Sequence, residues 1–125
     1  MPATSPPTDL TLYSAVACNY AHRTRIALAI KGTKYDLFEV DLLDRPADFM
    51  AMPSRGTVPA LAWDGGFVYG YSALNEFIEE QWPDPPLLPD DVLRRAEARS
   101  WVSLNLDKVS GPFEAALMVV AELAE

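Results

Sequence analysis

The stretch LYSAVACNYAHRTR, residues 12–25, decides the fold of this chain because it joins a strand, a turn and the start of a helix. Apolar and polar residues alternate over residues 10–14, which predicts a strand. Apolar residues then recur at helical spacing over residues 19–31, and Gly32 follows as a natural stop. Between these two segments lies Cys18, the single cysteine of the chain, at the expected N-terminus of the helix.

A thiol in this position has two interpretations. The free N–H groups and positive dipole end of a helix favour the thiolate, which is the nucleophilic form of cysteine. We therefore expect thiol chemistry at Cys18, with the sulfur accessible at the mouth of the helix. The alternative is a small buried hydrophobic residue, as free cysteines often are. His22, the single histidine, lies about one helical turn further on and is either an assisting base or an exposed helical residue.

Composition limits the class of protein. A chain of 125 residues allows one domain, or one domain and part of a second. The net charge of −8 argues against nucleic acid and anionic membrane as partners, because both attract clustered Lys and Arg. A single cysteine excludes an internal disulfide, and no Cys/His cluster suggests a metal site. No apolar run approaches the roughly 18 residues of a membrane span.

The N-terminal residues 1–9 are polar and contain three prolines, which predicts a disordered leader and not a signal peptide. A reduced single cysteine and the missing signal pattern lead us to expect a cytoplasmic protein.

The middle of the chain adds strands and helices to the first pair. Residues 35–43 are rich in β-branched and aromatic residues and predict a second strand, and residues 45–52 predict a short helix. Residues 59–63 and 67–69 flank the turn DGG at 64–66, which predicts a hairpin.

From Tyr71 the spacing is helical again, with an apolar stripe of Leu74, Phe77, Ile78 and Trp82. The first two strands should be parallel, because a helix joins them. The resulting βαβαββα order predicts an α/β, thioredoxin-like domain over residues 10–83.

Four prolines between residues 83 and 89 end that helix, and we expect a stiff linker over residues 84–89. A long helix should follow, with Asp90 and Asp91 in its first turn. Gly111-Pro112 is expected to kink or end it before a second helical run. Residues 90–125 are thus expected to form a separate all-α segment.

In order and spacing these segments resemble the glutathione transferase superfamily, most closely its cysteine-containing omega-like classes. The resemblance is carried by residues 12–25, VDLLDRP at 40–46, GTVPAL at 56–61, LNEFIEE at 74–80 with the proline linker after it, and RAEARSW at 95–101. It implies a glutathione-binding thioredoxin-like domain followed by a truncated helical domain. It also implies that Cys18 is the nucleophile of a thioltransferase or reductase, with glutathione as co-substrate alongside a small electrophile.

The resemblance also implies roles for individual residues. The Val58-Pro59 bond is expected to be cis, with the Val58 backbone edge pairing with the cysteinyl part of glutathione. Arg45 stands where omega-like members carry a lysine that reaches the glycyl carboxylate, the alternative being a solvated surface arginine. Tyr20 is expected to pack beside the site. Asn19 replaces the usual proline and can serve as the N-cap of the helix.

The expected pocket for the γ-glutamyl end of glutathione departs from the family pattern. Aligned on the apolar stripe, the family's acidic residue and serine are replaced here by Gly70 and Tyr71. Using Ser72 instead would rotate the stripe by about 100°, away from the core. A missing charged hydrogen bond costs roughly 1.5–3 kcal/mol, or about 10- to 150-fold in affinity. We therefore expect weak glutathione binding, or a different thiol.

The chain holds only part of the family's helical domain, so apolar residues such as Trp101 and Phe113 should lack cover. That favours a homodimer or other oligomer. Two alternatives to the thioltransferase stay open. One is a non-catalytic, transferase-like binding or assembly protein; the other is a specialised isomerase or tailoring enzyme acting on a metabolite.

Overall fold

The computed structural model describes residues 9–123, and the chain divides into two units between Pro85 and Pro86. This boundary falls inside the expected linker, residues 84–89. The expected leader lies outside the described residues, apart from Asp9.

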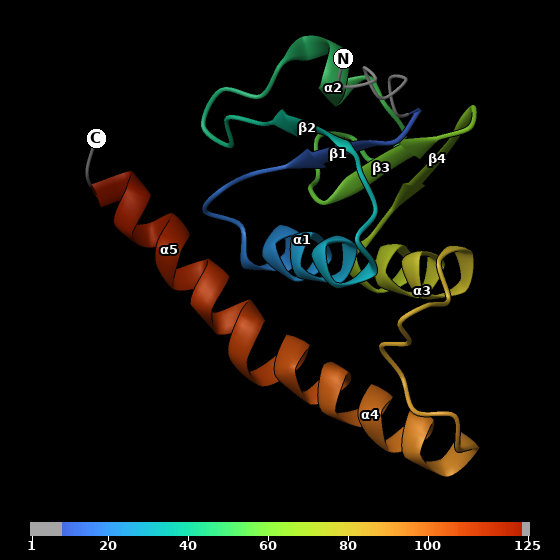
Figure 1. Ribbon diagram of the computed structural model, residues 1–125. Coiled ribbons are helices and arrows are strands. Elements are labelled where there is room, and N and C mark those ends of the chain that lie inside the picture. Colours follow the sequence, from blue (N-terminus) through green and yellow to red (C-terminus); the bar gives the residue numbers. More distant parts are fainter. Residues whose placement is uncertain (1–8, 124–125) are drawn as a thin grey trace. The chain divides into compact units, whose positions relative to one another are not determined.

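The first unit contains the seven elements that the sequence predicts, in the predicted order (Figure 1). They are β1 (Thr11–Ser14), α1 (Asn19–Lys31), β2 (Asp36–Glu39), α2 (Ala47–Met50), β3 (Ala60–Trp63), β4 (Gly66–Tyr69) and α3 (Tyr71–Gln81). The prediction for α1 is correct at both ends. Cys18 caps its start, and Gly32 closes its end in the left-handed conformation, with φ of 67°.

Two elements are shorter than the sequence predicts. β2 spans four residues because its partner β1 is only four residues long, so pairing runs from Thr11 opposite Asp36 to Ser14 opposite Glu39. Beyond Ser14 the chain turns into α1 and leaves β2 without a neighbour on that side. The second helix is a single turn that begins after Pro46, whose fixed φ suits a helix start.

The four strands form one mixed sheet in the order β2-β1-β3-β4. β1 and β2 are parallel, as expected for strands joined through a helix, while β1–β3 and β3–β4 are antiparallel. Helices α1 and α3 lie side by side on one face of the sheet, and α2 lies on the other (Figure 1). This is the thioredoxin-like arrangement that the sequence predicts.

The apolar stripe of α3 fills the core between the helices and the sheet. Leu74 and Ile78 are fully buried together with Leu12, Leu28 and Leu61 of the neighbouring elements. Since each buried leucine or isoleucine stabilises the fold by about 1.5–3 kcal/mol, this layer holds α1 and α3 against the sheet. The register of α3 that puts Gly70 and Tyr71 at its start is therefore the one observed.

A second core lies on the α2 side of the sheet. Phe49 is buried and stacks on Tyr13 of β1 at a ring-centroid distance of 5.1 Å. Phe38 and Phe67 also contact the Tyr13 ring, at 5.3 and 6.1 Å. This aromatic group anchors the short helix α2 to the sheet.

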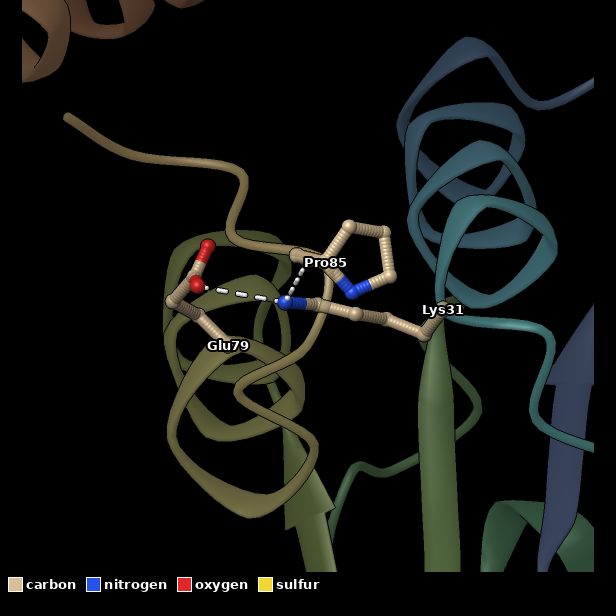
Figure 2. A network of polar contacts seen from close by, with 3 residues as sticks. All are labelled: Lys31, Glu79 and Pro85. Atoms are coloured by element: carbon tan, nitrogen blue, oxygen red, sulfur yellow. Dashed lines mark hydrogen bonds and ion pairs between the residues drawn. The ribbon is translucent and has the colours of Figure 1, made fainter.

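A buried polar network that was not predicted joins the end of α1 to α3 and to the chain after it. The Lys31 side chain is 0 % exposed, and its Nζ lies 3.1 Å from Glu79 Oε1 and 2.6 Å from the carbonyl oxygen of Pro85. Figure 2 shows the lysine reaching across to both partners. The network fixes the last residues of the first unit against its two long helices.

The second unit is helical from Val92 to Leu123. It consists of α4 (Val92–Asn105), a π-helical stretch η1 (Leu106–Ser110) and α5 (Gly111–Leu123). Asp91 caps α4 by accepting a hydrogen bond from the Arg94 N–H at 3.0 Å. Large apolar side chains are exposed along these helices, Trp101 at 71 % among them.

The expectation that Gly111-Pro112 ends or kinks the long helix is only partly right. Gly111 keeps helical φ and ψ of −59° and −56°, so α5 continues directly from η1. A proline lacks an N–H and its ring crowds the carbonyl four residues earlier. The wider π turn just before Pro112 takes up this irregularity without ending the helix.

Candidate functional site

Cys18 caps helix α1 with its sulfur. The residue has extended φ and ψ of −85° and 115°, and its Sγ accepts a hydrogen bond from the Ala21 N–H at 3.5 Å. Its own N–H donates to the Ala15 carbonyl at 3.0 Å, which closes the β1–α1 turn. The sulfur therefore lies at the positive end of the helix, where a negative charge is stabilised. Asn19, expected as the N-cap, is instead the first residue of the helix, because the sulfur already takes the capping bond.

The sulfur is covered, contrary to the expectation of an accessible thiol. Cys18 is 3 % exposed and forms a small cluster with Ala15 and Ala21. Tyr20, Leu42 and Val58 pack against this cluster. With only 3 % of Cys18 exposed, a reactant has little access to Sγ in this conformation. The cover comes from loops and a helix start, which are the parts of a fold that open most easily.

Arg25 holds the turn that carries Cys18. From α1 its Nη1 donates to the Ala15 carbonyl oxygen at 3.1 Å and also to the buried hydroxyl of Ser14. Its Nη2 lies 3.3 Å from Nδ1 of His22. His22 is exposed and is engaged by Arg25 on the surface of α1. The structure thus favours the interpretation of His22 as an exposed helical residue over that of a base that assists Cys18.

Val58 and Pro59 lie just before β3, beside the cysteine. The Val58-Pro59 peptide bond is cis, which confirms the prediction. Pro59 is buried and Val58 packs against the Cys18 cluster. A second cis bond, Asp84-Pro85, was not predicted, because X–Pro bonds without further context are usually trans.

Arg45 lies near the loop before β3 that contains Gly56 and Val58. Its Cδ is 3.3 Å from the position that a Cβ on Gly56 would occupy, so its aliphatic part covers that glycine. Gly56 comes two residues before Val58, and Arg45 is otherwise exposed.

Gly70 and Tyr71 form the start of α3. Gly70 occupies the N-cap position with φ of 91°, and among the described residues no side chain caps this helix. Tyr71 is 38 % exposed and stacks on Tyr20 of α1, with ring centroids 4.7 Å apart and an interplanar angle of 18°. The structure brings Tyr20 and Tyr71 together beside Cys18, because Tyr20 also packs on the cysteine cluster.

Arg23 is the residue at this site that sequence reasoning missed. Its Nη1 is shielded from solvent and has no hydrogen-bond partner among the described residues. Burial lowers the pKa of the Arg23 guanidinium, and the electrostatic influence of Tyr71 and Tyr20 opposes that change. A signal was present, since Tyr20 and Arg23 are three residues apart and share a helix face.

The described residues contain no group of three or more His, Cys, Asp or Glu side chains placed to hold a metal ion. Within the same part of the chain, no helix combines the length and apolar character that a membrane crossing requires.

Comparison with known proteins agrees with this architecture. The sheet order, the cis-proline before β3 and the cysteine at the start of α1 define a thioredoxin-like domain. The sequence model of the glutathione S-transferase N-terminal domain matches residues 17–81, slightly more than half of the chain. The chain therefore belongs to the glutathione S-transferase family.

Individual relatives support the assignment. A probable glutathione transferase of Aplysia californica is 42% identical over 82 residues, covering 66% of this chain and 89% of the relative. Glutathione S-transferase Z1 of Arabidopsis thaliana is 44% identical over 104 residues, covering 80% of this chain but 47% of the relative. The chain thus spans about half the length of the Arabidopsis transferase.

Solved structures give the same picture. Glutathione transferase Omega 3C of Trametes versicolor superposes with a TM-score of 0.78 at 34% identity, covering 86% of this chain and 47% of that one. This likeness agrees with the omega-like resemblance. Maleylacetoacetate isomerase of Anaeromyxobacter dehalogenans, solved with glutathione in its active site, gives a TM-score of 0.62 at 35% identity. That match covers 77% of this chain and 48% of the isomerase.

Proposed function

We propose that this protein is a glutathione-dependent thioltransferase whose nucleophile is Cys18. The observation that carries the proposal is the capping bond from the Ala21 N–H to Sγ at 3.5 Å. A sulfur that accepts a hydrogen bond at a helix N-terminus is stabilised as the thiolate, the form that attacks disulfides and electrophiles. Membership of the transferase family supplies glutathione as the expected thiol.

The proposed reaction is a thiol–disulfide exchange in two steps. The Cys18 thiolate attacks the glutathione sulfur of a mixed disulfide, forms a bond to it, and releases the other thiol, which takes up a proton. The thiolate of a second glutathione then attacks the glutathione sulfur of this adduct. Glutathione disulfide leaves and the Cys18 thiolate is regenerated. Because the chain has no second cysteine, the resolving thiol must come from solution.

The residues around Cys18 fit one end of glutathione better than the other. Val58 packs against the cysteine cluster, so its backbone edge is well situated to dock the cysteinyl part. Arg45 is close enough to the same loop to pair with the glycyl carboxylate. Gly70 and Tyr71 offer no carboxylate for the γ-glutamyl ammonium, so binding is expected to be weak.

Two other functions each have an observation in their favour. The 3 % exposure of Cys18 favours a non-catalytic binding or assembly protein, because a covered thiol reacts slowly. Likeness to a glutathione-bound maleylacetoacetate isomerase favours an isomerase or tailoring enzyme acting on a metabolite. In such an enzyme glutathione itself would be the attacking thiol, and Cys18 would be dispensable.

The rate of Cys18 alkylation as a function of pH, with and without glutathione, tests the proposal. The chain has one cysteine, so the signal is unambiguous. We expect a midpoint below the value of about 8.5 for a free thiol, and slower alkylation in the presence of glutathione. A midpoint at or above about 8.5, without protection by glutathione, would leave the binding-protein alternative.

Cys18→Ser provides the matched control. The substitution keeps a small side chain that can cap α1, so the fold should survive while disulfide exchange disappears. Full glutathione-dependent activity in Cys18→Ser would instead support the isomerase alternative.

We also propose a cytoplasmic location, because a working cysteine thiolate needs a reducing compartment. Assembly into a homodimer or larger oligomer is proposed as well. The exposed apolar side chains of α4 and α5, such as Trp101, Val109 and Phe113, are the surface that such an assembly would cover.

A further inference from the structure

Arg25 bonds to the turn between β1 and α1 at the point where the turn meets the cysteine. Its Nη1 donates to the Ala15 carbonyl oxygen at 3.1 Å and also to the Ser14 hydroxyl. The same Ala15 oxygen accepts the Cys18 N–H at 3.0 Å. Residues seven apart lie on one side of a helix, and helical side chains lean toward the N-terminus. The Arg25 guanidinium therefore lies at the start of α1, bonded to the same oxygen as the Cys18 backbone.

Glu39 supports the next part of the same turn. Its Oε1 accepts a hydrogen bond from the Val16 N–H. Glu39 is the last residue of β2 and lies opposite Ser14 of β1 in the parallel register. Val16 is 81 % exposed, so packing does little to fix its backbone, and this hydrogen bond takes on that role. Side chains from α1 and from β2 thus hold consecutive residues of the turn.

The position of the Cys18 sulfur depends on this turn. Sγ accepts the Ala21 N–H at 3.5 Å while Cys18 has extended φ and ψ of −85° and 115°. Hydrogen bonds weaken steeply when their angles are distorted, so a shift of the Ala15 carbonyl would carry Cys18 with it and weaken the cap. Arg25 opposes that shift. Its guanidinium stays charged at all ordinary pH values, and a cation near a cysteine also favours the thiolate.

We propose that Arg25 and Glu39 are positioning residues for Cys18, which hold the β1–α1 turn in the geometry in which Sγ caps α1. Neither side chain touches a reacting atom. A planar guanidinium suits the task because it donates in several fixed directions at once, which an ammonium does not. His22 Nδ1 lies 3.3 Å from Nη2 of Arg25, so both terminal nitrogens of the guanidinium have neighbours. This inference rests on the proposed function for the chemistry of the thiolate.

The pH profile of Cys18 alkylation by iodoacetamide separates positioning from a general loosening of the structure. The plateau rate at high pH reports how readily a reagent reaches Sγ, whereas the midpoint reports how well the thiolate is stabilised. Arg25→Gln should raise the midpoint by about 0.5–1 unit, less than the 1–3 units of a charge in direct contact, because Arg25 acts through the turn. Well below the midpoint, the thiolate fraction is then about 3- to 10-fold smaller.

Further variants assign the effect to these two side chains. Arg25→Lys should raise the midpoint less than Arg25→Gln, because the charge stays while the planar donors are lost. Amide hydrogen exchange at Ala21 measures the cap directly and should be several-fold faster in Arg25→Gln and Glu39→Ala. Glu39→Gln keeps an acceptor for the turn and should exchange like wild type. Arg94→Gln, which removes an exposed arginine of α4, is the matched control and should change neither readout.

The inference is overturned if Arg25→Gln, with a circular-dichroism spectrum like wild type, keeps the wild-type midpoint or changes only the plateau rate. Unchanged exchange at Ala21 in Arg25→Gln and Glu39→Ala would also overturn it. If Arg25→Gln does not fold, Arg25→Lys and the two Glu39 variants decide by the same readouts. A wild-type midpoint at or above about 8.5 contradicts the proposed thiol chemistry, whereas exchange at Ala21 still decides whether the turn is held. The two failures are therefore distinguishable.

Discussion

The Lys31–Glu79 pair provides the most direct test of how the first unit is held together. The Lys31 side chain is 0 % exposed and its Nζ contacts Glu79 and the Pro85 carbonyl (Figure 2). Glu79→Leu leaves the ammonium buried with one neutral acceptor. Lys31→Met leaves a carboxylate that is 17 % exposed and can be hydrated. The two substitutions should therefore lower the free energy of unfolding by different amounts.

The magnitudes follow from this asymmetry. Removing one partner of a buried ion pair costs about 3–5 kcal/mol, and Glu79→Leu is expected near 3 kcal/mol because Glu79 is not fully buried. Lys31→Met should cost about 1–2 kcal/mol, the size of a lost hydrogen bond. The double variant should be nearly as stable as wild type, because an apolar pair of similar volume needs no counter-charge.

Urea denaturation of the two single variants and the double variant measures these free energies as a double-mutant cycle. Glu79→Leu should also lower Tm by about 10 °C or more. Glu80→Leu, at an exposed neighbouring position, is the control and should change stability by less than about 0.5 kcal/mol. If both single variants cost less than about 1 kcal/mol, the pair behaves like a surface salt bridge and the reasoning is refuted.

Three further predictions concern the core, a tight turn and assembly. Phe49→Ala should destabilise the protein by about 3–5 kcal/mol in urea, because it removes the ring stacked on Tyr13; a loss below about 1 kcal/mol would contradict this. Gly56→Ala should cost about 1–3 kcal/mol, since φ is +82° and the new Cβ would lie 2.2 Å from Met50 Sδ. Gly65→Ala, with φ of +76° and open space around it, should cost less in the same assay, and an equal cost would exclude a role for the Met50 contact. Sedimentation at micromolar concentration should show a dimer or larger species, and a well-folded monomer would disprove assembly.

Local signals in the sequence predicted most of the fold. The bounds of helix α1 were predicted to the residue because its periodicity and Gly32 lie within the segment itself, although its cap is Cys18 and not Asn19 as expected. The ends of β2 were not, because they depend on the length of β1, a neighbour in space. The π turn before Pro112 was not predicted, because a helix can continue past a proline by a local change in its hydrogen bonding, which the sequence pattern does not indicate.

The candidate site was likewise predicted in part, from local features but not from contacts between distant segments. The cis bond at Val58-Pro59 was expected from the family resemblance and is observed. Contacts between distant segments were not predictable from one sequence. Lys31 and Glu79 are 48 residues apart in the chain, and the Tyr20–Tyr71 stack likewise joins two separate helices. The unpartnered Arg23 Nη1 was not predictable either, because its shielding depends on the folded structure.

The burial of Cys18, which is 3 % exposed, has a kinetic consequence. Any reagent meets the sulfur only in the fraction of molecules that are momentarily open, so each observed rate is the product of an opening constant and an intrinsic rate. An open fraction of about 1% would slow every reaction about 100-fold, a penalty of about 2.7 kcal/mol. Replacing Leu42 by a smaller residue would then increase the reaction rate without changing a reacting atom. The reactivity of the single cysteine thus also reports how often the structure around it opens.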